Sequence, residues 1–108
     1  MAELIETEAD FESKVINAGR PVLVDFYADW CTPCKALAPV IEELAGELSG
    51  KVDVFKVDVD KIQSVAAKYG IQSIPTVILF NGGEPASTFV GLRTKEEYLA
   101  AATQAAGE

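Results

Sequence analysis

The only two cysteines of the chain, Cys31 and Cys34, are separated by two residues. The hydrophobic run 22–27 precedes them, and a helical pattern follows from about 33 to 48. The pair therefore lies at the amino end of a predicted helix, where free backbone N–H groups and the helix dipole favour a thiolate over a thiol. Two thiols in this setting predict a reversible dithiol–disulfide couple, and hence a redox protein.

Two non-catalytic roles remain open for the cysteine pair. A structural disulfide across so short a loop would remove little entropy from the unfolded chain and would stabilise the fold weakly. A structural zinc ion usually needs four ligands, and a chain with two cysteines and no histidine could hold one only by sharing it with a second chain. For a redox role, we expect Cys31 to be the more exposed thiol and Cys34, about a turn further along the helix, to be the more buried one.

The composition indicates one domain, spanning residues 1–108, with enough apolar residues (49%) for a core of its own. A formal net charge of −8 disfavours binding to nucleic acids or anionic membranes, because like charges repel. The first residues lack the basic start and long apolar stretch of a secretory signal, and no apolar run approaches the length of a membrane span. We therefore expect a cytoplasmic protein.

Predicted strands and helices alternate along the chain. The strands fall near 4–5, 22–27, 52–59, 76–80 and 87–90, and the helices near 7–18, 33–48, 60–69 and 94–106. Thr7, Asp60 and Thr94 are the expected helix N-caps, and Pro39 is expected to kink the second helix. The order β-α-β-α-β-α-β-β-α predicts an α/β fold, with a mixed sheet of about five strands between two layers of about four helices in all. We expect the strands joined by helices to be parallel and the last hairpin to be antiparallel.

The second informative residue is Asp25, a carboxylate in the middle of an apolar strand pattern. Burial should raise its pKa by desolvation, and a neutral or titrating carboxyl could exchange protons with Cys34, directly or through one water. The alternative is a carboxylate at the strand edge that is solvated or paired with a cation. Lys56, in the neighbouring strand pattern, is the candidate partner.

Four further residues stand close to this chemistry in the predicted fold. Pro33 suits the first turn of the helix and stiffens the loop between the thiols. Pro75 precedes a strong strand, where proline is tolerated and where an X-Pro bond can be cis. Gly91, at the end of the last strand, marks either a close backbone approach or a turn. Trp30 is either a core aromatic or a lid beside Cys31, and its place in a loop favours partial exposure.

The chain resembles the thioredoxin family over essentially its whole length. Residues 30–35, Trp-Cys-Thr-Pro-Cys-Lys, are similar to the family signature Trp-Cys-Gly-Pro-Cys-Lys. Further matching segments are 24–28 for the buried-aspartate strand, Pro39 for the helix kink, 56–58 for the central strand, 70–76 for the cis-proline segment and 90–91 for the substrate-surface glycine. Together these motifs are far more specific than the spacing of the two cysteines alone.

The resemblance implies a thioredoxin-like three-layer fold and a mechanism. It implies that Cys31 attacks a substrate disulfide, that Cys34 resolves the mixed disulfide, and that Asp25 assists proton transfer at Cys34. It also implies that Pro75 is cis, faces the thiols and helps to hold an extended substrate segment. The implied apolar docking surface is rimmed by Trp30, Ile74, Thr76 and Gly91.

The resemblance also implies the partners. These are thioredoxin reductase and proteins with disulfides, such as reductases and peroxidases. The only redox group required would be the Cys31–Cys34 disulfide, with no added cofactor and no metal ion, and we expect a monomer.

Two positions depart from the family pattern. Thr32 replaces the usual glycine between the thiols, and Tyr27 stands where many members carry tryptophan. Thr32, Pro33 and Lys56 are therefore the expected tuning residues of the redox couple. We predict a thiol–disulfide oxidoreductase that acts mainly as a reductant. The alternatives are an oxidant or isomerase on the same scaffold, which a high reduction potential would indicate, and a non-catalytic interaction subunit, which activity of a double cysteine variant would reveal.

Overall fold

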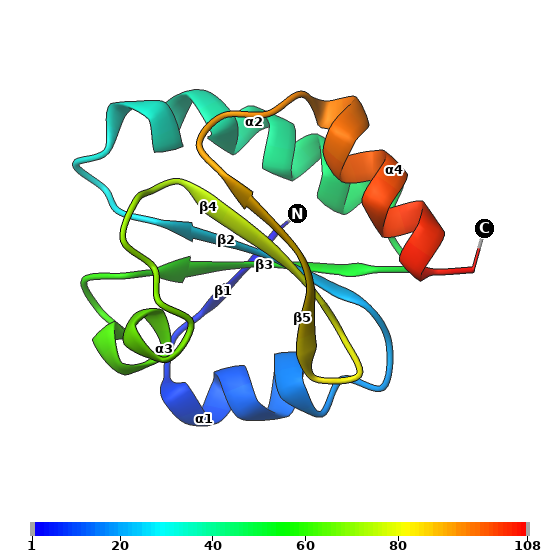
Figure 1. Ribbon diagram of the computed structural model, residues 1–108, viewed down its shortest axis with the longest axis horizontal. Coiled ribbons are helices and arrows are strands. Elements are labelled where there is room, and N and C mark those ends of the chain that lie inside the picture. Colours follow the sequence, from blue (N-terminus) through cyan, green and yellow to red (C-terminus); the bar gives the residue numbers. More distant parts are fainter. Residues whose placement is uncertain (1, 108) are drawn as a thin grey trace.

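The computed structural model describes residues 2–107, which form one sheet between two helical layers (Figure 1). The five strands are ordered β1-β3-β2-β4-β5 across the sheet. They are β1 (Glu3–Ile5), β2 (Val22–Tyr27), β3 (Asp53–Asp58), β4 (Thr76–Asn81) and β5 (Glu84–Val90). The helices are α1 (Glu8–Phe11) with its π-helical continuation η1 (Glu12–Ile16), α2 (Thr32–Glu47), α3 (Gln63–Lys68) and α4 (Lys95–Ala105). This arrangement confirms the predicted three-layer α/β fold.

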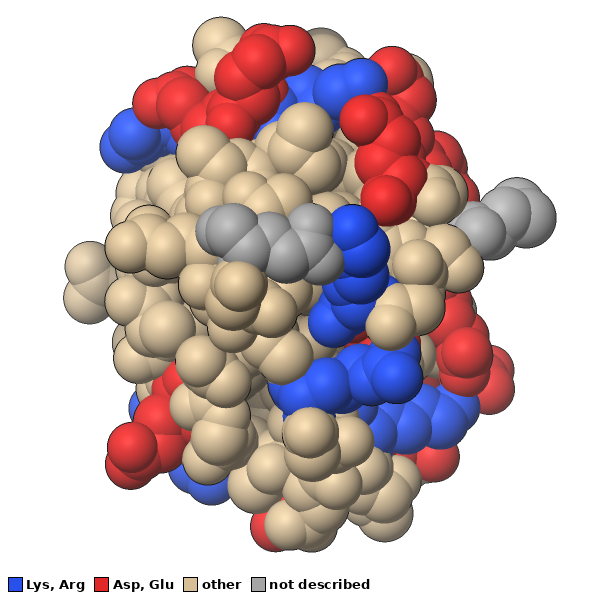
Figure 2. All heavy atoms as spheres, turned by 90° about the vertical axis from the view of Figure 1, so that its right-hand side faces the viewer, with Lys and Arg blue, Asp and Glu red and all other residues tan. Residues whose placement is uncertain are grey.

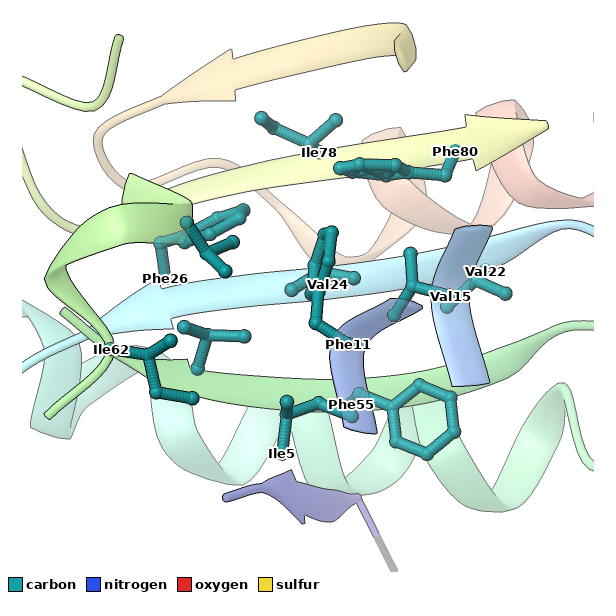
Figure 3. Close-up of a cluster of buried hydrophobic side chains, with 12 residues drawn as sticks. Ile5, Phe11, Val15, Val22, Val24, Phe26, Phe55, Ile62, Ile78 and Phe80 are labelled. Atoms are coloured by element: carbon teal, nitrogen blue, oxygen red, sulfur yellow. The ribbon is translucent and has the colours of Figure 1, made fainter. Parts of the chain in front are cut away.

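The central strand β2 is covered on both faces, as its apolar composition predicts. Val22, Val24 and Phe26 join the core against α1 and α3, whereas Leu23 joins the core against α2 and α4. This alternation follows from the two-residue period of a strand. Figure 3 shows the first core, to which β1, α1, β3 and β4 also contribute side chains. Asp25 shares its sheet face with Leu23, so its carboxyl lies beneath α2.

The direction of β4 differs from the prediction. Although α3 connects β3 to β4, β4 runs antiparallel to its neighbour β2, while β1, β3 and β2 are parallel as expected. The reason is the length of α3, since six residues of helix span about 9 Å and a six-residue strand spans about 20 Å. The chain therefore stays at the end of the sheet where β3 finishes, and β4 starts from there (Figure 1). This geometry places the segment before β4 beside the cysteine loop.

Two of the three predicted N-caps are confirmed. Thr7 Oγ1 accepts a hydrogen bond from the backbone N–H of Asp10 at 3.0 Å, and Thr94 forms a full capping box with Glu97. Asp60 does not cap α3, because the helix starts three residues later and has Ile62 at its N-cap position. The Asp60 carboxylate is engaged in the functional site instead.

The first helix is shorter and less regular than the predicted helix over 7–18. Its α-helical part ends at Phe11, and the chain continues as a π-helix to Ile16, closed by a hydrogen bond from the Asn17 N–H to the Glu12 carbonyl. The helix end packs closely on the β4–β5 hairpin. A Cβ atom added at Gly83 would lie 2.8 Å from the backbone oxygen of Ile16.

This close approach predicts that alanine at the two glycines of the hairpin lowers the free energy of unfolding by different amounts. Gly82 and Gly83 both have positive φ, 65° and 81°, but a Cβ on Gly82 would meet nothing within 4 Å. Gly82→Ala should therefore lower the free energy of unfolding by about 1 kcal/mol, from left-handed backbone strain alone. Gly83→Ala should lower it by at least about 1 kcal/mol more, because steric overlap is added. Urea unfolding of the oxidised protein measures both losses, and equal losses would contradict the packing argument.

Charged side chains of both signs share the surface. Figure 2 shows the face to the right of Figure 1, where Lys and Arg side chains form a band flanked by Asp and Glu. Ion pairs join Lys14 to Glu3 at 2.6 Å and Arg20 to Asp53 at 3.3 Å. Such exposed pairs contribute little to stability. Among the described residues, no helix combines the length and apolar character needed to cross a bilayer.

Candidate functional site

The two cysteines lie at the start of α2 and form a disulfide, with their Cα atoms 5.2 Å apart. Cys31 is the N-cap residue, and its Sγ accepts a hydrogen bond from the backbone N–H of Cys34 at 3.2 Å. Thr32 and Pro33 form the first turn between them, where proline loses no hydrogen bond. The N–H groups of this turn and the dipole of a sixteen-residue helix favour negative charge on Cys31.

The expected difference in exposure between the cysteines is almost absent in this disulfide form. Cys31 is 4% exposed and Cys34 is 3% exposed. Both pack with Ala28, and Ile74 and Tyr27 cover the group. Cys31 Sγ lies 3.8 Å from the Ile74 carbonyl oxygen, which is a contact because a disulfide sulfur carries no proton to donate. The structure therefore brings the segment before β4 directly against the first cysteine.

Trp30 lies on the outside of this site. Its side chain is 69% exposed, and its Nε1 donates a hydrogen bond to the Asp60 Oδ2 atom at 2.8 Å. The loop that follows β3 thus fixes the orientation of the indole ring. Sequence reasoning missed this role of Asp60, since the two residues are 30 positions apart and only the parallel pairing of β2 and β3 brings their loops together.

The segment before β4 and the end of β5 meet at the same edge. The Ile74–Pro75 peptide bond is cis, and the Pro75 carbonyl oxygen accepts a hydrogen bond from the Gly91 N–H at 2.9 Å. Pro75 is itself buried, and Ile74 is half-buried. Thr76 is 3% exposed, and its hydroxyl donates to the Ser73 carbonyl oxygen at 2.6 Å. The Thr76 side chain therefore supports this segment from inside and adds no exposed surface.

Two exposed apolar residues flank Gly91 and were not among the sequence-predicted site residues. Val90 is 52% exposed and Leu92 is 54% exposed. Their signal in the sequence was a pair of large apolar side chains on either side of a glycine, at the end of a predicted strand. With Trp30, they account for most of the large apolar side chains exposed in the described part of the chain.

Asp25 is buried beneath the site without a partner. Its side chain is 1% exposed, and neither carboxylate oxygen has a hydrogen-bond partner in the structure. Desolvation by burial raises the pKa of Asp25 to about 7, and the positive charge of Lys56 only partly opposes this rise. The predicted rise by desolvation is thus confirmed, and the strand-edge alternative is wrong.

A pocket joins Asp25 to the second cysteine. It has a volume of about 140 Å³, and Asp25, Cys34 and Lys56 are among the residues that line it. A pocket of this size with polar groups on its wall has room for several waters. Asp25 and Cys34 therefore share a space through which a proton can pass. Among residues 2–107, no group of three or more His, Cys, Asp or Glu side chains lies close enough together to hold a metal ion.

A cysteine pair at the amino end of a helix, above a five-stranded mixed sheet with helices on both faces, defines a thiol–disulfide redox protein of the thioredoxin-like class. The family model named Thioredoxin matches residues 2–104. The thioredoxin of Staphylococcus epidermidis is 52% identical over 96 residues, which cover 89% of this chain and 90% of that protein. The thioredoxin of Rickettsia felis is 46% identical over 93 residues, which cover 86% of this chain and 89% of that protein.

The chain belongs to the thioredoxin family. Membership and the bonded Cys31–Cys34 pair together support a thiol–disulfide oxidoreductase.

Proposed function

We propose that this protein reduces disulfides of other proteins by dithiol–disulfide exchange, with Cys31 as the nucleophile and Cys34 as the resolving thiol. The observation that carries the proposal is the hydrogen bond from the Cys34 N–H to Cys31 Sγ at the start of α2. This donor stabilises negative charge on Cys31, whereas Cys34 lines the pocket that it shares with Asp25.

The first step is attack on the substrate. The Cys31 thiolate forms a bond to one sulfur of the substrate disulfide, and the other substrate sulfur leaves as a thiolate. The exposed side chains of Trp30, Val90 and Leu92, with half-buried Ile74, provide apolar surface on which a substrate segment docks. Pro75 and Gly91 hold this edge together through their backbone hydrogen bond.

The second step releases the substrate. The Cys34 thiol must lose its proton before its sulfur attacks Cys31 Sγ, and this expels the second substrate thiolate. Asp25 is the proposed acceptor of that proton, directly or through water in the shared pocket. A carboxyl with a pKa of about 7 suits the task, because it can both take up and give back a proton near neutral pH.

The oxidised protein needs two electrons and two protons to return to the dithiol. We propose that thioredoxin reductase supplies them in the cytoplasm and that no cofactor beyond the Cys31–Cys34 couple is required. Thr32 and Pro33, in the turn between the sulfurs, and Lys56, beside Asp25, are the proposed tuning residues of this couple.

Cys34→Ser tests the order of the two steps. This variant keeps the Cys31 nucleophile and lacks the resolving thiol, so it should form a covalent adduct with a disulfide substrate such as insulin but should not release it. Non-reducing electrophoresis and intact mass should show one substrate molecule per protein, which dithiothreitol removes. If Cys31→Ser traps the substrate instead, the assignment of the two roles is reversed and the proposal fails.

A further inference from the structure

Lys56 and Asp25 lie directly opposite each other in the sheet, yet they do not form an ion pair. In the parallel pairing of β2 with β3, Asp25 is in register with Lys56, and Tyr27 is in register with Asp58. Both oxygens of the Asp25 carboxyl lack a hydrogen-bond partner. The Lys56 Nζ atom lies 4.5 Å from the centroid of the Tyr27 ring instead.

Strand geometry explains how one ammonium can reach either partner. Asp25 and Tyr27 are two residues apart on β2, so both point to the same sheet face as Lys56, and they are separated by about 6.6 Å along the strand. A lysine side chain is long enough to lean over that distance. When the Lys56 side chain leans towards Tyr27, its ammonium lies beside a half-buried residue, closer to water than it would be beside the fully buried Asp25.

We propose that the Tyr27 ring acts as a positioning residue, which holds the Lys56 ammonium by a cation–π contact and so keeps it from pairing with the Asp25 carboxyl. The face of a phenol ring attracts a cation and, unlike a carboxylate, leaves the electrostatic environment of Asp25 nearly unchanged. The inference rests on the proposed function only for the role of Asp25 in proton transfer. The placement of Lys56 can be tested without disulfide exchange.

The position of the Lys56 ammonium affects the pH range in which the Asp25 carboxyl carries a proton. A cation within 4 to 6 Å of a carboxylate typically lowers its pKa by about 1 to 3 units. An ammonium paired with Asp25 would keep the carboxyl ionised near neutral pH, whereas an ammonium held on the ring lets burial dominate and leaves the pKa at about 7. The ring would therefore preserve the carboxyl as a proton acceptor that can also return its proton.

Other titratable groups surround Asp25 and must be considered in any pH measurement. They are Tyr27 on β2, Lys56 and Asp58 on β3, Asp29 in the loop after β2, Cys34 and Lys35 on α2, and Tyr98 on α4. Lys35 is exposed, and the positive charge of Lys56 opposes the rise in the pKa of Asp25 that burial causes.

The test is a titration of the Asp25 carboxyl carbon by NMR in the oxidised protein. Tyr27→Leu removes the ring face, so Lys56 should turn to Asp25 and the carboxyl pKa should fall by about 1 unit or more. Tyr27→Phe is the matched control, because it keeps the ring and removes only the hydroxyl, and it should leave the pKa of Asp25 nearly unchanged. An unchanged Asp25 pKa in Tyr27→Leu would overturn the proposal.

Loss of the ring also admits water, which would lower the pKa of Asp25 on its own. Lys56→Met separates the two effects, since it removes the ammonium and keeps most of the side-chain volume. With Lys56→Met already present, Tyr27→Leu should lower the Asp25 pKa clearly less than it does with Lys56 in place, because only the effect of water remains. An equal fall with and without the ammonium would overturn the proposal.

A measurement on the unsubstituted protein covers the case in which Tyr27→Leu does not fold. The Lys56 ε-methylene protons should be shifted upfield by the ring current of Tyr27, and ordinary shifts for these protons would overturn the proposal. These readouts are independent of activity. If they hold but the protein reduces no disulfide, the proposed function fails and the positioning role stands.

Discussion

Cys31→Ser should abolish the reduction of insulin disulfides, leaving only the rate seen with dithiothreitol alone. A serine hydroxyl does not ionise near neutral pH, so the helix start has no thiolate to place on a substrate sulfur. Cys34 should not substitute for it, because Cys31 is the N-cap residue whose sulfur accepts the backbone N–H at the helix start. Turbidity from precipitated insulin chains measures the loss.

A matched control separates loss of the nucleophile from loss of the disulfide. Cys34→Ser also lacks the disulfide, yet its remaining thiol should react with iodoacetamide near neutral pH at least about tenfold faster than the thiol left in Cys31→Ser. The reason is that the Cys31 sulfur accepts the backbone N–H of residue 34 at the helix start, which stabilises its thiolate. Residual insulin reduction by Cys31→Ser would refute the nucleophile assignment, and equal alkylation rates would refute its physical basis.

Asp25→Ala should make the oxidised protein more stable near pH 8. Burial raises the pKa of Asp25 from its ordinary value of 3.8 to about 7, so the folded protein holds a proton on this carboxyl that the unfolded chain has lost. Between these pH values stability falls by about 1.4 kcal/mol per pH unit, which amounts to about 4 kcal/mol in all. The stabilising contribution of the neutral carboxyl is complete below about pH 4 and is lost as pH rises through 7.

Urea unfolding of the oxidised protein at several pH values measures this effect. The unsubstituted protein should lose stability from pH 4 to 7, whereas Asp25→Ala should lack that slope and should gain about 2 to 4 kcal/mol at pH 8, after the cost of the deleted side-chain atoms. Asp58→Ala is the control, because Asp58 is also buried (3% exposed) but accepts a hydrogen bond from the Asp60 N–H at 2.9 Å. It should destabilise the protein by about 1 kcal/mol. A loss of stability in Asp25→Ala would show that the carboxylate is paired.

The same variant should turn over substrate more slowly. With no carboxyl in the pocket, the Cys34 proton must leave to water, and the reduction rate should fall about tenfold or more near pH 7. Greater stability together with a lower rate distinguishes a strained functional group from one that serves only the fold, since a purely structural carboxylate would not show both.

The position of the thiols, the burial of Asp25 and two helix caps could be predicted, because each depends on residues that are close together in the sequence. The Cys31-to-Cys34 spacing, a strand before it and a helix after it determine where the thiols sit relative to the helix dipole. The apolar neighbours of Asp25 in sequence predict that its carboxyl loses water, because both faces of such a strand are usually covered, and the burial in the structure excludes the alternative at a strand edge. The caps at Thr7 and Thr94 are likewise contacts between residues three positions apart.

Only the tertiary structure decided the features that depend on how distant segments meet. The antiparallel pairing of β4 with β2, the hydrogen bond from Trp30 to Asp60 and the contact of Lys56 with Tyr27 each join residues from different strands or loops. Asp60 was able to cap α3 or to accept a hydrogen bond from Trp30, and Lys56 was able to pair with Asp25 or to contact Tyr27. Composition and periodicity assign a residue to an element and a face, but the choice between partners is made by distance, and distances between elements are set by packing of the whole sheet.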